Sequence, residues 1–161
     1  MVHTEFRLLI TGWRFWPRSY AGIIYKHLED FLENHVQDGQ TLVVVDGACP
    51  YDGVDTYAHE WAERQQAAGL PVRSERHRAN FSTEGRAAGP RHNQLMVDLG
   101  ADGYMAFPEL PFDPAATGPT QSGTHDCIRK ARAAGIVGVE HPYRIPFQEP
   151  RPPAAQEPLW A

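Results

Sequence analysis

The chain contains the stretch Thr41-Leu-Val-Val-Val-Asp-Gly-Ala-Cys-Pro-Tyr-Asp-Gly-Val-Asp55, in which an apolar run leads into a glycine-rich turn. Residues 41–45 are rich in β-branched side chains and do not alternate with polar ones, which is typical of a strand covered on both faces. The residues after the turn have helical spacing: Tyr57, Ala58, Trp61 and Ala62. The stretch therefore predicts a strand–turn–helix unit.

The same unit recurs along the chain. Further apolar runs predict strands at 6–11, 71–75, 103–107 and 136–139, and helices are expected to begin near Ser19, Pro90 and Ser122. This alternation predicts an α/β fold, a Rossmann-like three-layer sandwich with a mainly parallel sheet of about five strands. We expect one domain at residues 1–145 and a proline-rich tail at 146–161.

Composition limits the functional classes. A chain of 161 residues with two cysteines and a net charge of −5 fits one cytoplasmic domain without a disulfide framework. Its N-terminus lacks the apolar run of a signal peptide, and no apolar segment approaches the roughly 20 residues that span a bilayer. The acidic balance argues against nucleic acid as a partner and leaves a small anionic ligand compatible.

The turns between strands and helices are expected to share one edge of the sheet. In parallel sheets the carboxyl ends of the strands meet at a rim, and ligands bind there near the switch in strand order. The turns at Gly12, 47–55, 89–93 and 108–124 all leave strands in this direction. The run 109–121 contains three prolines and is long, which favours a mobile or ligand-covering loop.

An anion site is expected where Gly89-Pro90-Arg91 opens a helix. Pro90 suits the first helical position, because its missing N–H has no intrahelical partner there. The free backbone N–H groups and the Arg91 guanidinium can hold a phosphate or carboxylate. The alternative is that Pro90 only caps the helix and Arg91 is a surface residue. We expect this helix to bury Leu95, Met96 and Leu99, and His92 and Asn93 to orient the ligand or Arg91.

Two further glycine turns offer phosphate contacts. Ser122, Gly123 and Thr124 precede another helix and predict phosphate binding by backbone N–H groups and a hydroxyl, with an ordinary N-cap as the alternative. Gly12 and Arg14 lie in another such turn and are expected to contact a phosphate for the same reason. The alternative for Arg14 is that its loop, which also holds two tryptophans, packs against the domain or a second subunit.

The turn at residues 46–55 supplies acidic candidates. Asp55 can bind a ribose hydroxyl, although a helix cap is the favoured reading. Asp46 and Gly47 follow a strand, where Asp46 fits either ligand contact or stabilisation of the turn. Cys49 has no histidine near it in the sequence, so no nucleophilic role is expected.

A resident metal or cofactor is not expected. None of the eight histidines has a recognised ligand spacing. A site built from His92, His125 and Asp126 on the shared rim is the remaining, disfavoured alternative.

Four segments together resemble one known family: Thr11-Gly-Trp-Arg14, residues 46–55, Gly85-Arg-Ala-Ala-Gly-Pro-Arg-His-Asn93 with Met96, and Ser122-Gly-Thr-His-Asp126. In order and spacing they are similar to the YspA-like family of the SLOG superfamily, whose members occur in bacteria and their phages. The resemblance covers approximately residues 6–139. It implies a Rossmann-like domain that binds a nucleotide or a nucleotide-derived ligand.

The resemblance also supplies candidate chemistry. LOG enzymes of this superfamily hydrolyse the N-glycosidic bond of nucleoside monophosphates with a helix-start arginine and a glutamate. Arg91 matches the arginine, whereas Cys127 fills the glutamate position and Asp126 lies one residue earlier. Arg91 and Asp126 are therefore the catalytic candidates. The departure puts hydrolysis in doubt, because that reaction needs a carboxylate.

Three functions follow as hypotheses. The principal one is binding of a nucleotide or nucleotide-derived phosphorylated ligand, as a sensor or processor, by a homodimer. The alternative is a nucleoside 5′-monophosphate phosphoribohydrolase of the LOG type. The second alternative is single-stranded DNA binding of the DprA type, which the acidic charge disfavours.

Overall fold

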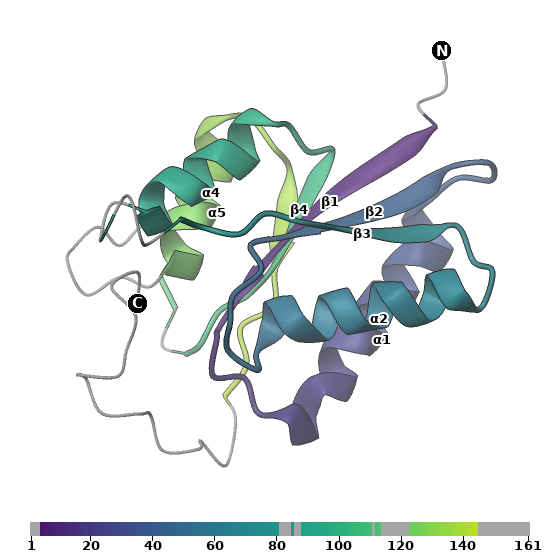
Figure 1. Ribbon diagram of the computed structural model, residues 1–161, viewed down its shortest axis with the longest axis horizontal. Coiled ribbons are helices and arrows are strands. Elements are labelled where there is room, and N and C mark those ends of the chain that lie inside the picture. Colours follow the sequence, from purple (N-terminus) through teal and green to yellow (C-terminus); the bar gives the residue numbers. More distant parts are fainter. Residues whose placement is uncertain (1–3, 81–84, 86–87, 111, 114–122, 145–161) are drawn as a thin grey trace.

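A computed structural model describes residues 4–80, 85, 88–110, 112–113 and 123–144 (Figure 1). The elements follow one another as β1 (Glu5–Gly12), the short helix η1 (Arg18–Tyr20), α1 (Ala21–His35), β2 (Thr41–Asp46), α2 (Val54–Ala67), β3 (Val72–Arg76), α4 (Ala88–Asp98), β4 (Gly103–Phe107), α5 (Gly123–Ala133) and β5 (Gly138–Glu140).

These strands form a single parallel sheet in the order β3-β2-β1-β4-β5. Helices α1 and α2 cover one face, and α4 and α5 cover the other (Figure 1). The expected three-layer, Rossmann-like α/β fold is confirmed. Strand order reverses direction at β1, so the carboxyl ends of β1 and β4 flank the switch point.

The central strand β1 explains the unbroken apolar runs. Leu8 and Ile10 pack into the core beneath α1 and α2, while Leu9 packs into the core beneath α4 and α5. All three side chains are at most 1% exposed. A strand with a core on each side has no polar face, which is why no alternation is seen in its sequence.

Helix α4 differs from the expectation. It begins at Ala88, so Pro90 is its third residue, where a missing N–H still costs no intrahelical bond. Leu95 and Leu99 are 51% and 50% exposed, and the buried side chains of the helix are those of Ala88, Met96 and Val97. The expectation that the two leucines are buried is wrong, because they lie on an i, i+4 row turned away from the sheet.

Strand β5 is shorter than expected and lies at the edge of the sheet. It starts at Gly138 rather than residue 136, and Val137 and Val139 are 79% and 41% exposed. An apolar run at this position therefore does not mark a strand covered on both faces. Most of the expected 109–121 loop and the whole 146–161 tail lie outside the described residues.

None of the helices in the described part of the chain has the length and apolar run needed to cross a membrane.

Candidate functional site

Helices α4 and α5 begin side by side at the carboxyl ends of the strands (Figure 1). The Asn93 side-chain amide on α4 donates to the Gly123 carbonyl at 3.1 Å and to the Asp126 carboxylate at 2.9 Å on α5. Lys130 Nζ reaches back from α5 to the Pro90 carbonyl at 2.7 Å. These contacts hold the two amino-terminal turns together.

The paired helix starts form a positive region of the rim. Each presents backbone N–H groups and the positive end of a helix dipole. Arg91, in the first turn of α4, is exposed, and Gly89 is its half-buried neighbour on that turn. Thr124, in the first turn of α5, is 6% exposed. Ser122 lies outside the described residues.

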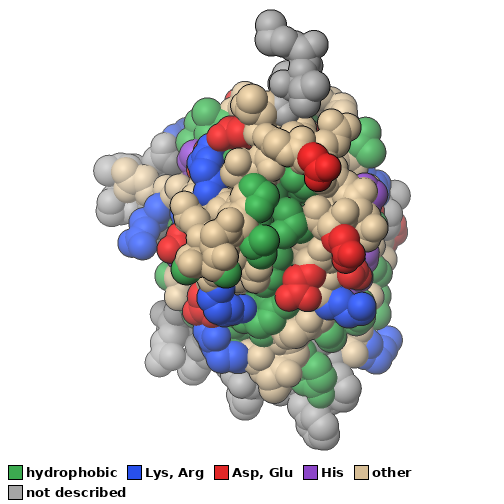
Figure 2. All heavy atoms as spheres, turned by 90° about the vertical axis from the view of Figure 1, so that its right-hand side faces the viewer, with side chains coloured by type: hydrophobic (Ala, Val, Ile, Leu, Met, Phe, Trp, Pro, Cys, Tyr) green, Lys and Arg blue, Asp and Glu red, His purple; other side chains and the backbone are tan. Residues whose placement is uncertain are grey.

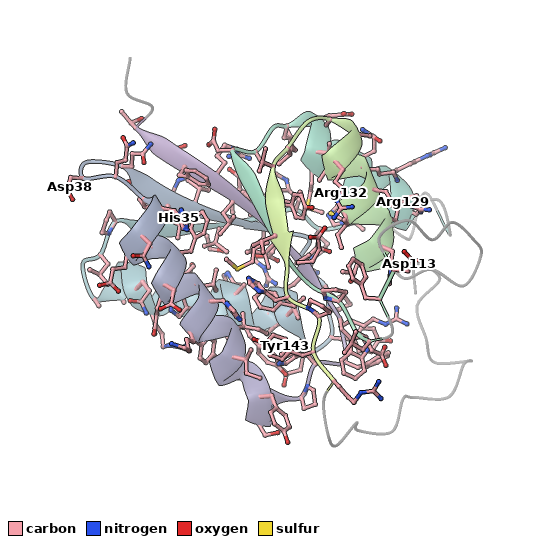
Figure 3. The ribbon with its side chains drawn as sticks, turned by 180° about the vertical axis from the view of Figure 1, so that it is seen from behind. His35, Asp38, Asp113, Arg129, Arg132 and Tyr143 are labelled. Carbon is pink, nitrogen blue, oxygen red and sulfur yellow. The ribbon has the colours of Figure 1, made fainter. Side chains whose placement is uncertain are left out.

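Asp126 occupies the first turn of α5, where a carboxylate is favourable. Besides the Asn93 amide it accepts a hydrogen bond from Lys130 at 2.8 Å, and Arg129 lies 3.6 Å away. Figure 3 shows Arg129 on α5. The carboxylate is thus engaged in joining α4 to α5, and a catalytic role would require it to act from within this network.

Cys127 takes the place at which the resembling enzymes carry a glutamate. It is 1% exposed, and burial raises the pKa of its thiol to about 12. The side chain is therefore a neutral thiol at physiological pH. It cannot replace a carboxylate as a base.

Asp46 ends β2 with a fully buried side chain. Its carboxylate accepts the Ala48 N–H at 2.7 Å and pairs with Arg76 of β3 at 3.0 Å. The turn-stabilising reading of Asp46 is confirmed. Ala48 has φ 51°, a left-handed conformation that is costly for a non-glycine residue and is held here by the Asp46 contact.

Asp55 lies in the first turn of α2 and does not cap it. The N-cap is Gly53, which has no side-chain cap bond, and Asp55 instead accepts the Cys49 N–H at 3.3 Å. The preferred interpretation of Asp55 as the helix cap is wrong. Helix α2 begins at Val54, so Asp55 is its second residue and does not occupy the cap position. Burial, followed by the charge of Asp46, raises the pKa of the Asp55 carboxyl to about 7.

The turn that holds Asp55 contacts the start of α4. A Cβ added to Gly47 would lie 2.8 Å from His92 Cε1 and 3.2 Å from Asp55 Oδ2. The His92 ring is hydrogen-bonded to the His77 carbonyl, and burial lowers its pKa. The small size of Gly47 thus lets the β2–α2 turn meet α4.

Gly12 is required by packing. A Cβ at this position would lie 2.5 Å from Cγ2 of Val54, so the end of β1 could not approach the start of α2. Packing against Val54 therefore accounts for the glycine at position 12, and no ligand contact is needed to explain it.

Arg14 lies in the loop after β1, among aromatic rings. Its guanidinium carbon is 4.8 Å from the Phe15 ring centroid and 5.5 Å from that of Tyr51. Trp13 and Trp16 of the same loop are 6% and 1% exposed, which confirms that the tryptophans pack into the domain.

Sequence reasoning missed two features of the rim. One is the ion pair between Asp46 and Arg76, and the other is the contact of Arg14 with Phe15 and Tyr51. Arg76 ends β3 in register with Asp46 at the end of β2, and these opposite charges at two neighbouring strand ends are the available signal for the first. The second joins two loops and has no signal in the sequence.

Within the described residues no group of three His, Cys, Asp or Glu side chains is arranged to hold a metal ion.

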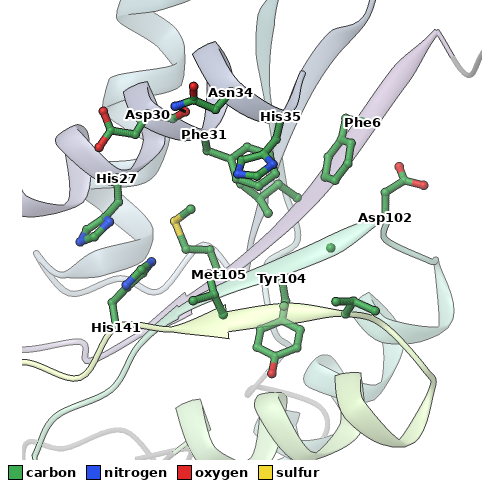
Figure 4. A pocket seen from close by; sticks show the side chains of 15 residues that line it. Phe6, His27, Asp30, Phe31, Asn34, His35, Asp102, Tyr104, Met105 and His141 are labelled. Atoms are coloured by element: carbon green, nitrogen blue, oxygen red, sulfur yellow. Dashed lines mark hydrogen bonds between the residues drawn. The ribbon is translucent and has the colours of Figure 1, made fainter. Parts of the chain in front are cut away.

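A cavity of about 520 Å³ lies elsewhere, between α1 and the β4–β5 edge (Figure 4). The rings of His27 and His141 stack there with centroids 3.8 Å apart, and Asp30 and Asp102 also line it. None of its described lining residues is Lys or Arg. The face at the amino ends of the strands carries a hydrophobic strip with both acidic and basic side chains around it (Figure 2). The cavity is a poor place for an anion, unlike the rim.

Comparison with known proteins identifies a phage relative. No protein-family model and no solved structure matches the chain. Gene 61 protein of Mycobacterium phage D29 is 35% identical over 130 residues, which cover 81% of this chain and 91% of that protein. The chain therefore belongs to the same protein family as Gene 61 protein of Mycobacterium phage D29.

Proposed function

We propose that the protein binds a nucleotide or nucleotide-derived phosphorylated ligand at the strand-end rim. The observation that carries this proposal is the bonded pair of helix starts, in which Asn93 of α4 donates to Gly123 and Asp126 of α5. Two adjacent helix N-termini concentrate N–H donors and positive potential at one place, which suits a phosphate. Arg91 adds an exposed guanidinium to that place.

The finer family assignment is part of this proposal. The motifs that resemble the YspA-like family of the SLOG superfamily lie on these turns and helix starts, and the relative in phage D29 fits the bacterial and phage occurrence of that family. A role as a sensor or processor of a nucleotide signal follows from that assignment.

Calorimetric titration of the full chain with a panel of nucleoside mono-, di- and triphosphates tests the binding. We expect at least one to bind and Arg91→Ala to weaken it at least tenfold. Arg64→Ala is the matched control, since Arg64 is an exposed arginine late in α2. An absence of binding across the panel, or equal binding by Arg91→Ala, refutes the site.

Hydrolysis of the N-glycosidic bond is the second candidate, favoured by the Asp55 carboxyl. A group whose pKa is about 7 is suited to proton transfer at neutral pH. Chromatography of nucleoside monophosphates after incubation would show released base. Loss of activity in Asp126→Asn assigns the reaction to Asp126, and loss in Asp55→Asn alone assigns it to Asp55. No released base from any monophosphate rejects the reaction.

We further propose that the protein acts in the cytoplasm as a homodimer. Both cysteines are free thiols, which agrees with a reducing compartment. Light scattering after size-exclusion chromatography measures the mass. A monomer at micromolar concentration contradicts the dimer.

A further inference from the structure

We propose that the groove between α1 and the β4–β5 edge of the sheet is a docking surface for a basic amphipathic helix of a partner protein. The groove is the cavity of about 520 Å³ shown in Figure 4. It lies on the sheet face that α1 and α2 cover, whereas α4 and α5 lie on the other face. The inference is therefore independent of the proposed nucleotide binding.

The two faces of the β4–β5 pair are covered to different extents. On the side of α5, the Tyr104 side chain is 3% exposed and its hydroxyl donates to Glu140 of β5 at 2.7 Å. Successive side chains of a strand point to opposite faces, so Val137 and Val139 point toward α1. These valines line the groove and are 79% and 41% exposed. Among the described residues, this face of β5 is left open to solvent.

The groove has an apolar floor and a helical wall. Phe6 of β1 and Met105 of β4 continue the floor from the two valines, and Phe31 of α1 belongs to the wall (Figure 4). An occupant that fills the groove must therefore contact a helix and the face of several strands at once. A helix laid beside α1 does this, as in other α/β sheets whose faces are covered by helices. A strand added to the edge of β5 would lie outside the groove.

The charges around the groove favour a basic partner. Asp30 of α1 and Asp102, which precedes β4, line it, and none of its described lining residues is Lys or Arg. Burial lowers the pKa of both His27 and His141, so these lining rings are neutral at physiological pH. Lys26 lies 3.7 Å from the Asp30 carboxylate, but both side chains are exposed and such pairs are weak. Lysine or arginine side chains along the partner helix would complement the two carboxylates.

The same charges argue against a second copy of this chain as the occupant. Closed pairs of identical subunits use the same patch on both subunits. The exposed side of α1 carries Glu29, Asp30 and Glu33 next to the groove. In a two-fold contact these carboxylates would face their own counterparts, which is unfavourable.

Fluorescence anisotropy with two labelled peptides tests the surface in the full chain. Both probes are amphipathic helical peptides of about 18 residues with leucines at i, i+3, i+4 and i+7. One carries lysines on its polar face and the other carries glutamates. We expect the lysine peptide to bind with a micromolar dissociation constant and the glutamate peptide to bind about tenfold more weakly or not at all.

Three variants locate the binding. Val137→Lys puts a cation on the exposed apolar floor and should weaken the lysine peptide about tenfold. Asp30→Asn should weaken it about threefold and make its binding less sensitive to salt. Leu70→Lys is the matched control, because it adds the same charge at an apolar residue that is 44% exposed and precedes β3, at the opposite edge of the sheet. It should bind like wild type, and unchanged melting temperatures establish that the variants are folded.

Hydrogen exchange distinguishes a docked helix from an added strand. The Val137 carbonyl accepts the Tyr104 N–H at 3.1 Å, and His141 N–H donates to the Ala106 carbonyl at 2.7 Å. Backbone groups of alternate residues point to the same neighbouring strand, so Gly138 directs its N–H to the open edge. We expect the bound lysine peptide to leave exchange of this N–H fast. Slowed exchange at Gly138 indicates strand addition and overturns the helix.

Three further results overturn the docking surface. One is equal binding of the two peptides or binding of neither, and another is equal weakening by Val137→Lys and Leu70→Lys. The third comes from light scattering of the protein without peptide. A wild-type dimer that Val137→Lys converts to a monomer places a second copy of the chain in the groove.

Discussion

Asn93 Nδ2 on α4 lies 2.9 Å from Asp126 Oδ2 on α5, and this contact between residues 33 apart in the chain is one of those that join the two helix starts. Asp126 also accepts a hydrogen bond from the Lys130 ammonium group, so the negative charge of Asp126 is balanced inside the network. The neighbouring N–H groups are thereby placed before any ligand arrives. Binding then requires little rearrangement of the protein.

Replacement of Asn93 should separate the helix starts. We expect Asn93→Leu to lower the free energy of unfolding by about 1–2 kcal/mol, because Asp126 and the Gly123 carbonyl each lose a donor. Urea denaturation measures this change. Gln94→Leu is the control, since Gln94 bonds only within α4, to Asp98 at 2.8 Å, among the contacts that link described residues. Equal effects of the two substitutions would contradict the bridging role.

Replacement of Gly12 and of Gly22 by alanine should change the stability of the protein in opposite directions. Gly12→Ala would place a methyl group 2.5 Å from Val54 and should destabilise the protein by about 1–3 kcal/mol. Gly22 lies in α1 with no atom within 4 Å of an added Cβ, so Gly22→Ala should stabilise it by about 0.5–1 kcal/mol. Thermal unfolding distinguishes the signs, and destabilisation by both changes would refute the packing account of Gly12.

Asp55 should make stability fall as pH rises. Its folded-state pKa is raised from 3.8 to about 7, so the stabilisation by its proton is present below pH 3.8 and is lost as pH rises through 7. Asp55→Asn lacks this proton equilibrium. The variant should therefore gain about 2–3 kcal/mol relative to wild type between pH 5 and pH 8. Parallel denaturation series at the two pH values test this, and a pH-independent difference speaks against the buried carboxyl.

The stacked histidines His27 and His141 should make the stability of the protein fall as pH falls. Burial lowers the pKa of both His27 and His141, so their contribution is present above the ordinary value of 6.5 and is lost as pH falls through the folded-state values. Asp30, Lys26 and Glu140 add smaller charge effects. His141→Phe keeps a stacked ring and removes one proton site. Its melting temperature should fall by fewer degrees than that of wild type between pH 7 and pH 5.

A control separates this effect from loss of any histidine. His35→Phe changes a histidine at the end of the same helix, α1. We expect its melting temperature to follow that of wild type over this pH range. If the two histidine variants behave alike, the stack does not cause the pH dependence.

The fold was predictable from the sequence because strand–helix alternation and unbroken apolar runs depend on local pattern. Strand β1 illustrates this, since Leu8 and Leu9 face different cores. The helix face that contains Leu95 was not predictable, because α5 decides which side of α4 is covered. The same limit applies to the site. Its turns are visible in the sequence, but the bond between Asn93 and Asp126 depends on how two helices pack.

The position of β1 also bears on the order of folding. β1 pairs with β2 through contacts such as Leu9↔Val45, and with β4 through Leu9↔Tyr104. During synthesis the first neighbour emerges from the ribosome about 60 residues before the second. The central strand therefore keeps one open, apolar edge for several seconds of translation at bacterial rates. Completion of the sheet and creation of the full rim coincide in time, so a prematurely terminated chain exposes that edge and lacks the site.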